Sequence, residues 1–139
     1  MRRLVLAAML ALTAGCPAHR PPEPREDEAI RVARTAFDRL AAGDPEAAEL
    51  FDFPALRGAV VDTGASYRVI PDDASRAAFR LSFVKALGDS LRAANIRATG
   101  WVLEKRDGAV AVAAASLGDR RVHVTVLRGR VISVVRDPR

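Results

Sequence analysis

The feature that most constrains the fold is a series of short alternating segments in the last third of the chain. The ranges that read as strands are 99–105, 109–117, 121–127 and 130–135. In the third of them, Val122, Val124 and Val126 alternate with polar residues, which is the period of a strand with one buried face. The connections are short and contain glycine, as the Asp107-Gly108 pair illustrates. These features predict a four-stranded antiparallel meander.

Apolar residues ahead of the strands recur at the spacing of helices. Ile30, Ala33, Phe37 and Leu40 form one stripe, which begins after three acidic residues and ends at Gly43. This places arginines such as Arg39 on the solvent side.

A short second helix is predicted to follow, with Asp44 as its N-cap and Pro45 at its first position. The longest helix is expected over 73–94, with Phe79, Phe83 and Leu87 in one apolar row and Arg80 on the solvent-exposed side. We expect this helix to pack against the sheet.

The segment 55–71 leaves two interpretations open. Residues 59–61 and 67–70 are short strands, or the first of them continues as a helix, with Gly64 at a turn between them. In either case the fold class is α+β, with N-terminal helices and one long helix packed on a curved antiparallel sheet.

The order of these elements over 28–136 resembles the NTF2-like superfamily, a cone of curved sheet closed by helices. A second resemblance, to periplasmic lipid carriers of the Mla type, rests on residues 50–56, on the helix 75–91 and on the closing hairpins. That second resemblance implies an apolar cavity able to hold acyl chains.

The first sixteen residues have the form of an export signal. Arg2 and Arg3 precede an apolar run over 4–12, and small residues lead to Cys16. The run is shorter than the roughly 20 residues needed to span a bilayer. The segment resembles the bacterial lipoprotein signal and its lipobox, although Thr13 stands where an aliphatic residue is usual.

The resemblance implies cleavage between Gly15 and Cys16 and a lipid on the Cys16 thiol, which belongs to the only cysteine of the chain. The domains expected are 1–15 as signal peptide, 16–25 as lipidated cysteine and proline-rich tether, and 26–139 as one α+β domain. Because Pro17 is not aspartate, the resemblance favours the outer membrane, facing the periplasm, if the cell is Gram-negative. A chance cysteine behind an ordinary signal and a twin-arginine signal are the alternatives.

Candidate catalytic groups are few. His123 is either a general acid or base facing a cavity, or a half-exposed strand residue. Some NTF2-like enzymes use an aspartate base beside a tyrosine or aspartate donor, but Tyr67 is the only tyrosine and matches no such set. We therefore expect no catalytic residues and no cofactor.

A cluster of carboxylates is the one candidate for a metal site. It consists of Asp44, Glu46, Glu49 and Asp52, which either hold a hard cation or serve as helix caps and solvated residues. We prefer the second interpretation and expect no metal.

The function expected first is a membrane-anchored, non-enzymatic binding or structural domain. The alternative is a carrier whose cavity between sheet and long helix is lined by residues that include Phe37, Phe79, Phe83, Trp101 and His123. An NTF2-like enzyme comes third.

The last 35 residues carry eight Lys or Arg and three Asp. This surplus suits an anionic envelope component or serves solubility. Because of the export signal and the lack of aromatic residues among the basic ones, we expect no nucleic-acid partner. The oligomeric state is left open.

Overall fold

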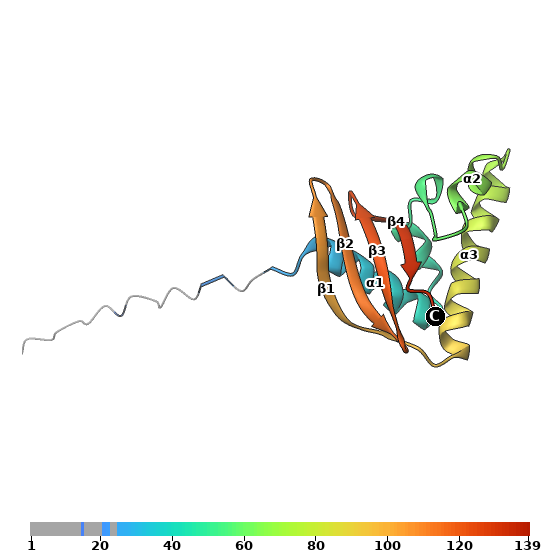
Figure 1. The fold of residues 1–139 in the computed structure, drawn as a ribbon. Helices are drawn as coiled ribbons and strands as arrows, with labels where there is room; N and C mark the ends of the chain where they lie inside the picture. Colours follow the sequence, from blue (N-terminus) through green and yellow to red (C-terminus); the bar gives the residue numbers. More distant parts are fainter. Residues whose placement is uncertain (1–14, 16–20, 23–24) are drawn as a thin grey trace, which may run out of the picture.

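The computed structural model describes residue 15, residues 21–22 and residues 25–139. Residues 1–14 and Cys16 lie outside the described part, so the predicted signal and lipidation site are not placed. The elements, in chain order, are α1 (Glu28–Ala42), the 3-10 helices η1 (Pro45–Leu50) and η2 (Phe53–Ala55), α2 (Thr63–Arg68), α3 (Asp73–Ala93), β1 (Ala98–Asp107), β2 (Val110–Leu117), β3 (Arg120–Leu127) and β4 (Arg130–Arg136) (Figure 1).

The four strands form one antiparallel sheet in the order β1-β2-β3-β4, which confirms the predicted meander. Register shifts interrupt the β1–β2 pairing twice and the β3–β4 pairing once. Such bulges bend and twist strands, so they account for curvature in the sheet. The class is therefore α+β, with helices packed on an antiparallel sheet.

The outer edge of β4 is covered by the chain that follows η1. Parallel bridges join Phe51 to Val131 and Arg57 to Ser133. The Arg57 N–H donates to the Ile132 carbonyl over 2.9 Å, and the Val134 N–H donates to the Arg57 carbonyl. This cover satisfies backbone groups that an open edge strand would leave to solvent.

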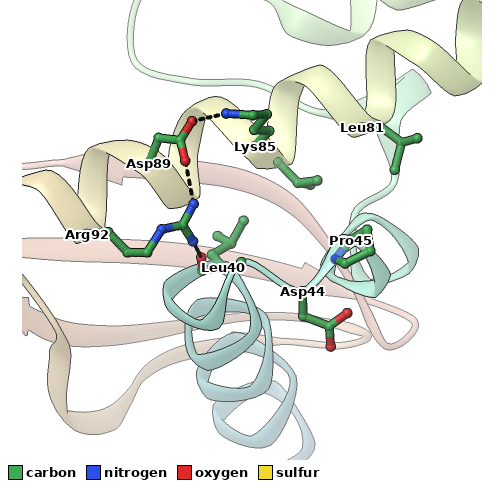
Figure 2. A pocket seen from close by; sticks show the side chains of 9 residues that line it. Leu40, Asp44, Pro45, Leu81, Lys85, Asp89 and Arg92 are labelled. Atoms are coloured by element: carbon green, nitrogen blue, oxygen red, sulfur yellow. Dashed lines mark hydrogen bonds and ion pairs between the residues drawn. The ribbon is translucent and has the colours of Figure 1, made fainter.

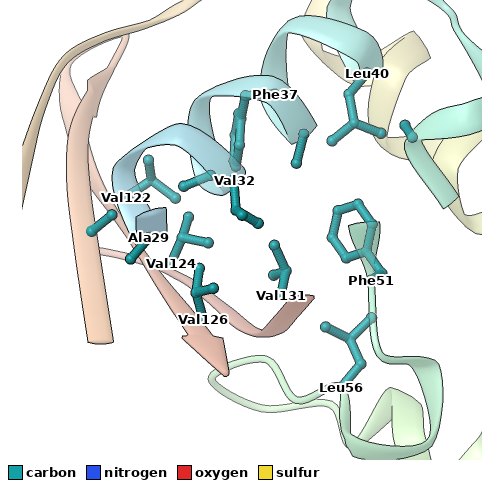
Figure 3. Close-up of a cluster of buried hydrophobic side chains, with 14 of the residues drawn as sticks. Ala29, Val32, Phe37, Leu40, Phe51, Leu56, Val122, Val124, Val126 and Val131 are labelled. Carbon is teal, nitrogen blue, oxygen red and sulfur yellow. The ribbon is translucent and has the colours of Figure 1, made fainter. Parts of the chain in front are cut away.

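Helix α1 begins and ends where the sequence indicates. The Asp27 carboxylate accepts the Ala29 N–H at its start, and Gly43 closes it with a left-handed φ of 71°. The side of α1 that carries Phe37 and Leu40 lies over the sheet, opposite Val122, Val124 and Val126 (Figure 3). This interface is the centre of the hydrophobic core.

Helix α3 differs from our expectation in its partner. It packs mainly on α1 and η1 rather than on the strands, and α1 is the helix that contacts all four strands. The close approach depends on Gly88, because a Cβ there would lie 2.5 Å from the Leu40 carbonyl oxygen. Arg92 then donates to the same carbonyl over 3.0 Å, near the C-terminus of α1. The apolar row of α3 thus faces helices and aromatic side chains.

The strands considered for residues 59–61 and 67–70 are absent: 59–61 is neither strand nor helix, and Tyr67 and Arg68 are the last two residues of α2. The Asp62 carboxylate caps this helix by accepting the Ala65 N–H over 2.9 Å. Gly64 packs against the Pro54 carbonyl, where a Cβ would meet the oxygen at 2.5 Å. Val60 is 95% exposed and Val69 is 80% exposed, so these valines do not belong to the core.

Among the described residues, no helix has both the length and the apolar character that crossing a membrane requires.

Candidate functional site

A cleft lined by three arginines is the site most suited to bind a ligand. Its volume is about 550 Å³, within the range of about 300–1,000 Å³ found for ligand pockets. We call it the arginine cleft. Its lining residues are Arg39, Ala48, Glu49, Leu50, Phe51, Phe53, Pro54, Tyr67, Arg80 and Arg130.

The three arginines come from three separate elements. Arg39 lies in the last turn of α1, Arg80 near the middle of α3, and Arg130 is the first residue of β4. The η1–η2 segment places Phe51 and Phe53 between these elements, and both side chains are buried. The cleft is therefore a product of tertiary packing.

Arg80 is held in place by a buried tyrosine. Its Nη1 donates to the Tyr67 hydroxyl over 2.6 Å. The Tyr67 ring lies 5.6 Å from the ring of Phe53 and 5.8 Å from that of Phe79, measured between centroids. Because the tyrosine is fixed by aromatic packing, it limits the rotamers that Arg80 can adopt.

The electrostatics of the arginine cleft favour an anion. Arg39 lies 3.8 Å from Asp44 and 4.0 Å from Glu46, so its charge is partly compensated. Within the described part of the chain, neither Arg80 nor Arg130 has a carboxylate oxygen within 4.0 Å. Glu49 is the only acidic residue of the lining, and the uncompensated positive charge of the cleft comes from Arg80 and Arg130.

A second cleft, of about 470 Å³, lies between the C-terminal end of α1 and α3 (Figure 2). Three of its four charged side chains are paired with one another. Asp89 bonds to Lys85 and to Arg92, and these hydrogen bonds, that of Lys85 first, lower the pKa of Asp89. Arg92 also donates to Leu40, so these charges serve the junction of α1 and α3.

The predicted cavity between helices and sheet exists but is small. It measures about 230 Å³ and is lined by Phe37, Leu87, Leu91 and Val134, among others. This is below the usual range for ligand pockets.

The residues predicted to line that cavity lie in separate places. Phe37 lines it, and Trp101 packs edge-on against Phe37 with centroids 5.4 Å apart. Phe79 and Phe83 belong instead to an aromatic cluster around Phe53, at centroid distances of 6.4 and 5.5 Å. His123 lies on the other face of the sheet.

His123 alternates along β3 with Val122 and Val124, which face α1, so its side chain projects from the opposite face. Nδ1 lies 2.5 Å from Glu104 Oε2, and Nε2 lies 2.8 Å from Asp137 Oδ1. The hydrogen bond with Glu104, followed by that with Asp137, raises the pKa of His123 above its usual 6.5. Both carboxylates therefore stabilise the protonated form of the ring.

The acidic cluster has a structural role at its first member. Asp44 accepts the Glu46 N–H over 2.9 Å and caps η1. The described residues contain no group of three or more His, Cys, Asp or Glu side chains placed to share a metal. Glu104 and Asp137 bind opposite sides of one imidazole and do not converge on a common point.

Sequence reasoning missed the arginine cleft. It assigned Arg39 and Arg80 to solvent-facing helix sides, because helical periodicity describes one element at a time. No local pattern links these residues to Arg130, which lies 50 positions after Arg80. The only sequence signal for the cleft was the surplus of basic residues in the last third of the chain. Of the three arginines, this range includes only Arg130.

Comparisons with protein families, curated proteins and solved structures found no match.

Proposed function

We propose that this chain is a lipid-anchored envelope lipoprotein whose domain is a non-enzymatic binding or structural module. The leader and Cys16 support the anchor. The observation that carries the non-enzymatic part is the environment of His123, the only histidine in the range 26–139. Both of its ring nitrogens are engaged by carboxylates, so the neutral lone pair that a general base needs is not presented to a substrate.

The third alternative, an NTF2-like enzyme, finds little support in the tyrosine. The hydroxyl of Tyr67 accepts a hydrogen bond from Arg80, whereas the His123 ring is engaged by Glu104 and Asp137. The NTF2-like cone itself remains part of the proposal. The bulged antiparallel sheet with α1 on one face supports it.

The small volume of the apolar cavity argues against the carrier alternative. The apolar cavity of about 230 Å³ is small for a ligand with long acyl chains. An anionic envelope component is the better partner, because the arginine cleft offers more than twice that volume and a positive lining.

Mass spectrometry of the mature N-terminus tests the anchor. We expect a first residue Cys16 that carries a diacylglyceryl group and an acylated amine, with the protein in the outer-membrane fraction. Several acyl chains, at about 0.8 kcal/mol for each buried methylene, hold a protein on a membrane almost permanently.

Cys16→Ser should abolish the lipid and release the chain from the membrane fraction. Thr13→Leu is the matched control, because it restores the aliphatic residue usual in the lipobox and should leave acylation intact. Recovery of the unmodified chain from a membrane-free extract, still starting at Met1, would contradict the proposal.

A further inference from the structure

We propose that the arginine cleft binds a phosphate group that carries an apolar chain. The inference names the ligand class of the module described above and relies on that proposal only for the setting in an envelope. It depends on the charges of the cleft, on its apolar lining and on the way Arg80 is held.

The number of guanidinium groups favours phosphate over carboxylate. A carboxylate has two oxygens and is satisfied by one bidentate arginine, whereas a phosphate has additional oxygens and up to two negative charges. Arg80 and Arg130 lack carboxylate partners within the described chain, and Arg39 lies at the same cleft. Two arginines and a partly neutralised third therefore line one cleft and offer more N–H donors than a carboxylate can use.

The rest of the lining suits an apolar chain. Ala48, Leu50, Phe51, Phe53 and Pro54 supply this part of the cleft. A small, fully hydrated anion would leave these side chains without a contact. A ligand with both a phosphate and a hydrocarbon segment uses the two parts together, and burial of each methylene of the segment strengthens binding.

The hydrogen bond between Arg80 and Tyr67 prepares the site. An arginine has five N–H donors, and only one of those of Arg80 is directed to the Tyr67 hydroxyl. The remaining donors stay available while the side chain is already ordered. Binding then avoids part of the entropic cost of ordering a long side chain.

The experiment is calorimetric titration of the mature, acylated chain in a non-ionic detergent. The probes are hexyl phosphate, hexanoate and inorganic phosphate. We expect hexyl phosphate to bind most tightly, because it alone satisfies both the arginines and the apolar lining. Equal affinity for inorganic phosphate, or no binding of hexyl phosphate, would overturn the inference.

Arg80→Gln and Arg130→Gln should each weaken binding of hexyl phosphate about tenfold or more, since each removes a charge-assisted contact. Arg121→Gln is the matched control, because Arg121 is exposed on β3 and is not a lining residue. An equal loss in the control would show non-specific attraction and overturn the site. Arg130 is also exposed, so its variant keeps the test valid if Arg80→Gln lowers stability.

The source of the phosphate is decided by competition. Phosphatidylcholine vesicles that contain lysophosphatidic acid should displace hexyl phosphate if the ligand is a lipid headgroup. Without displacement, the same site takes a soluble alkyl phosphate, and the inference stands in that form. If the chain is acylated but does not bind hexyl phosphate, this inference is wrong and the proposed lipid anchor stands. If the chain is not acylated but binds hexyl phosphate, the proposed anchor is wrong and this inference stands.

Discussion

At the scale of single residues, His123 makes stability depend on pH. Its folded pKa is raised above the usual 6.5 by Glu104 and Asp137, so the folded state holds the proton more tightly than the unfolded state. The contribution to stability is complete below about pH 6.5 and is lost as the pH rises through the folded value. We expect this contribution to be about 0.5–1 kcal/mol, because the partners are partly exposed and screened.

Urea unfolding at a series of pH values measures this effect. His123→Gln should remove the loss of stability that follows as the pH rises above about 6.5, while leaving Val122 and Val124 in place. Glu104→Gln removes the first cause of the shift and should bring the histidine pKa, followed by NMR, closer to 6.5. A variant with an unchanged pH profile would show that the ring does not titrate in this range.

At the scale of secondary-structure elements, the junction of α1 and α3 depends on Gly88. Alanine normally stabilises a helix relative to glycine by roughly 0.5–1 kcal/mol. Here its Cβ would lie 2.5 Å from the Leu40 carbonyl oxygen, so the helices must separate. We expect Gly88→Ala to lower the free energy of unfolding by about 1–3 kcal/mol, as overpacking does. Ser82→Ala, on the exposed side of α3, should change it by less than about 0.5 kcal/mol.

The elements also show how far the sequence predicts this fold. The strands and the ends of α1 were predicted within two residues, because alternation, caps and glycine turns are local signals. The structure of segment 55–71 was not predicted, because Val60, Val61 and Val69 are of a residue type that favours strands and yet are exposed. Its helix is fixed instead by Asp62 and by the packing of Tyr67 on Phe53, and the second of these needs residues 14 positions apart.

At the scale of the whole molecule, periodicity identified the apolar row of α3 but not its partner. A row such as Phe79, Phe83 and Leu87 is equally compatible with a sheet or with other helices, because both present apolar surface. The partner was decided by the return of the chain through Phe51 and Phe53 to the edge of β4. The same return creates the arginine cleft, which explains why the fold class was predictable and the site was not.

The boundary between tether and domain is testable by limited proteolysis of the membrane-bound chain. Arg25 is exposed and immediately precedes the residues that begin α1, so we expect trypsin to cut there first and release a soluble fragment that starts at Glu26. Arg57 is also exposed, but its backbone is bonded to Ile132 and Val134 of β4, which should slow cleavage there. N-terminal sequencing of the released material decides the order. Earlier cleavage at Arg57 would show that the cover over β4 opens more readily than the tether is cut.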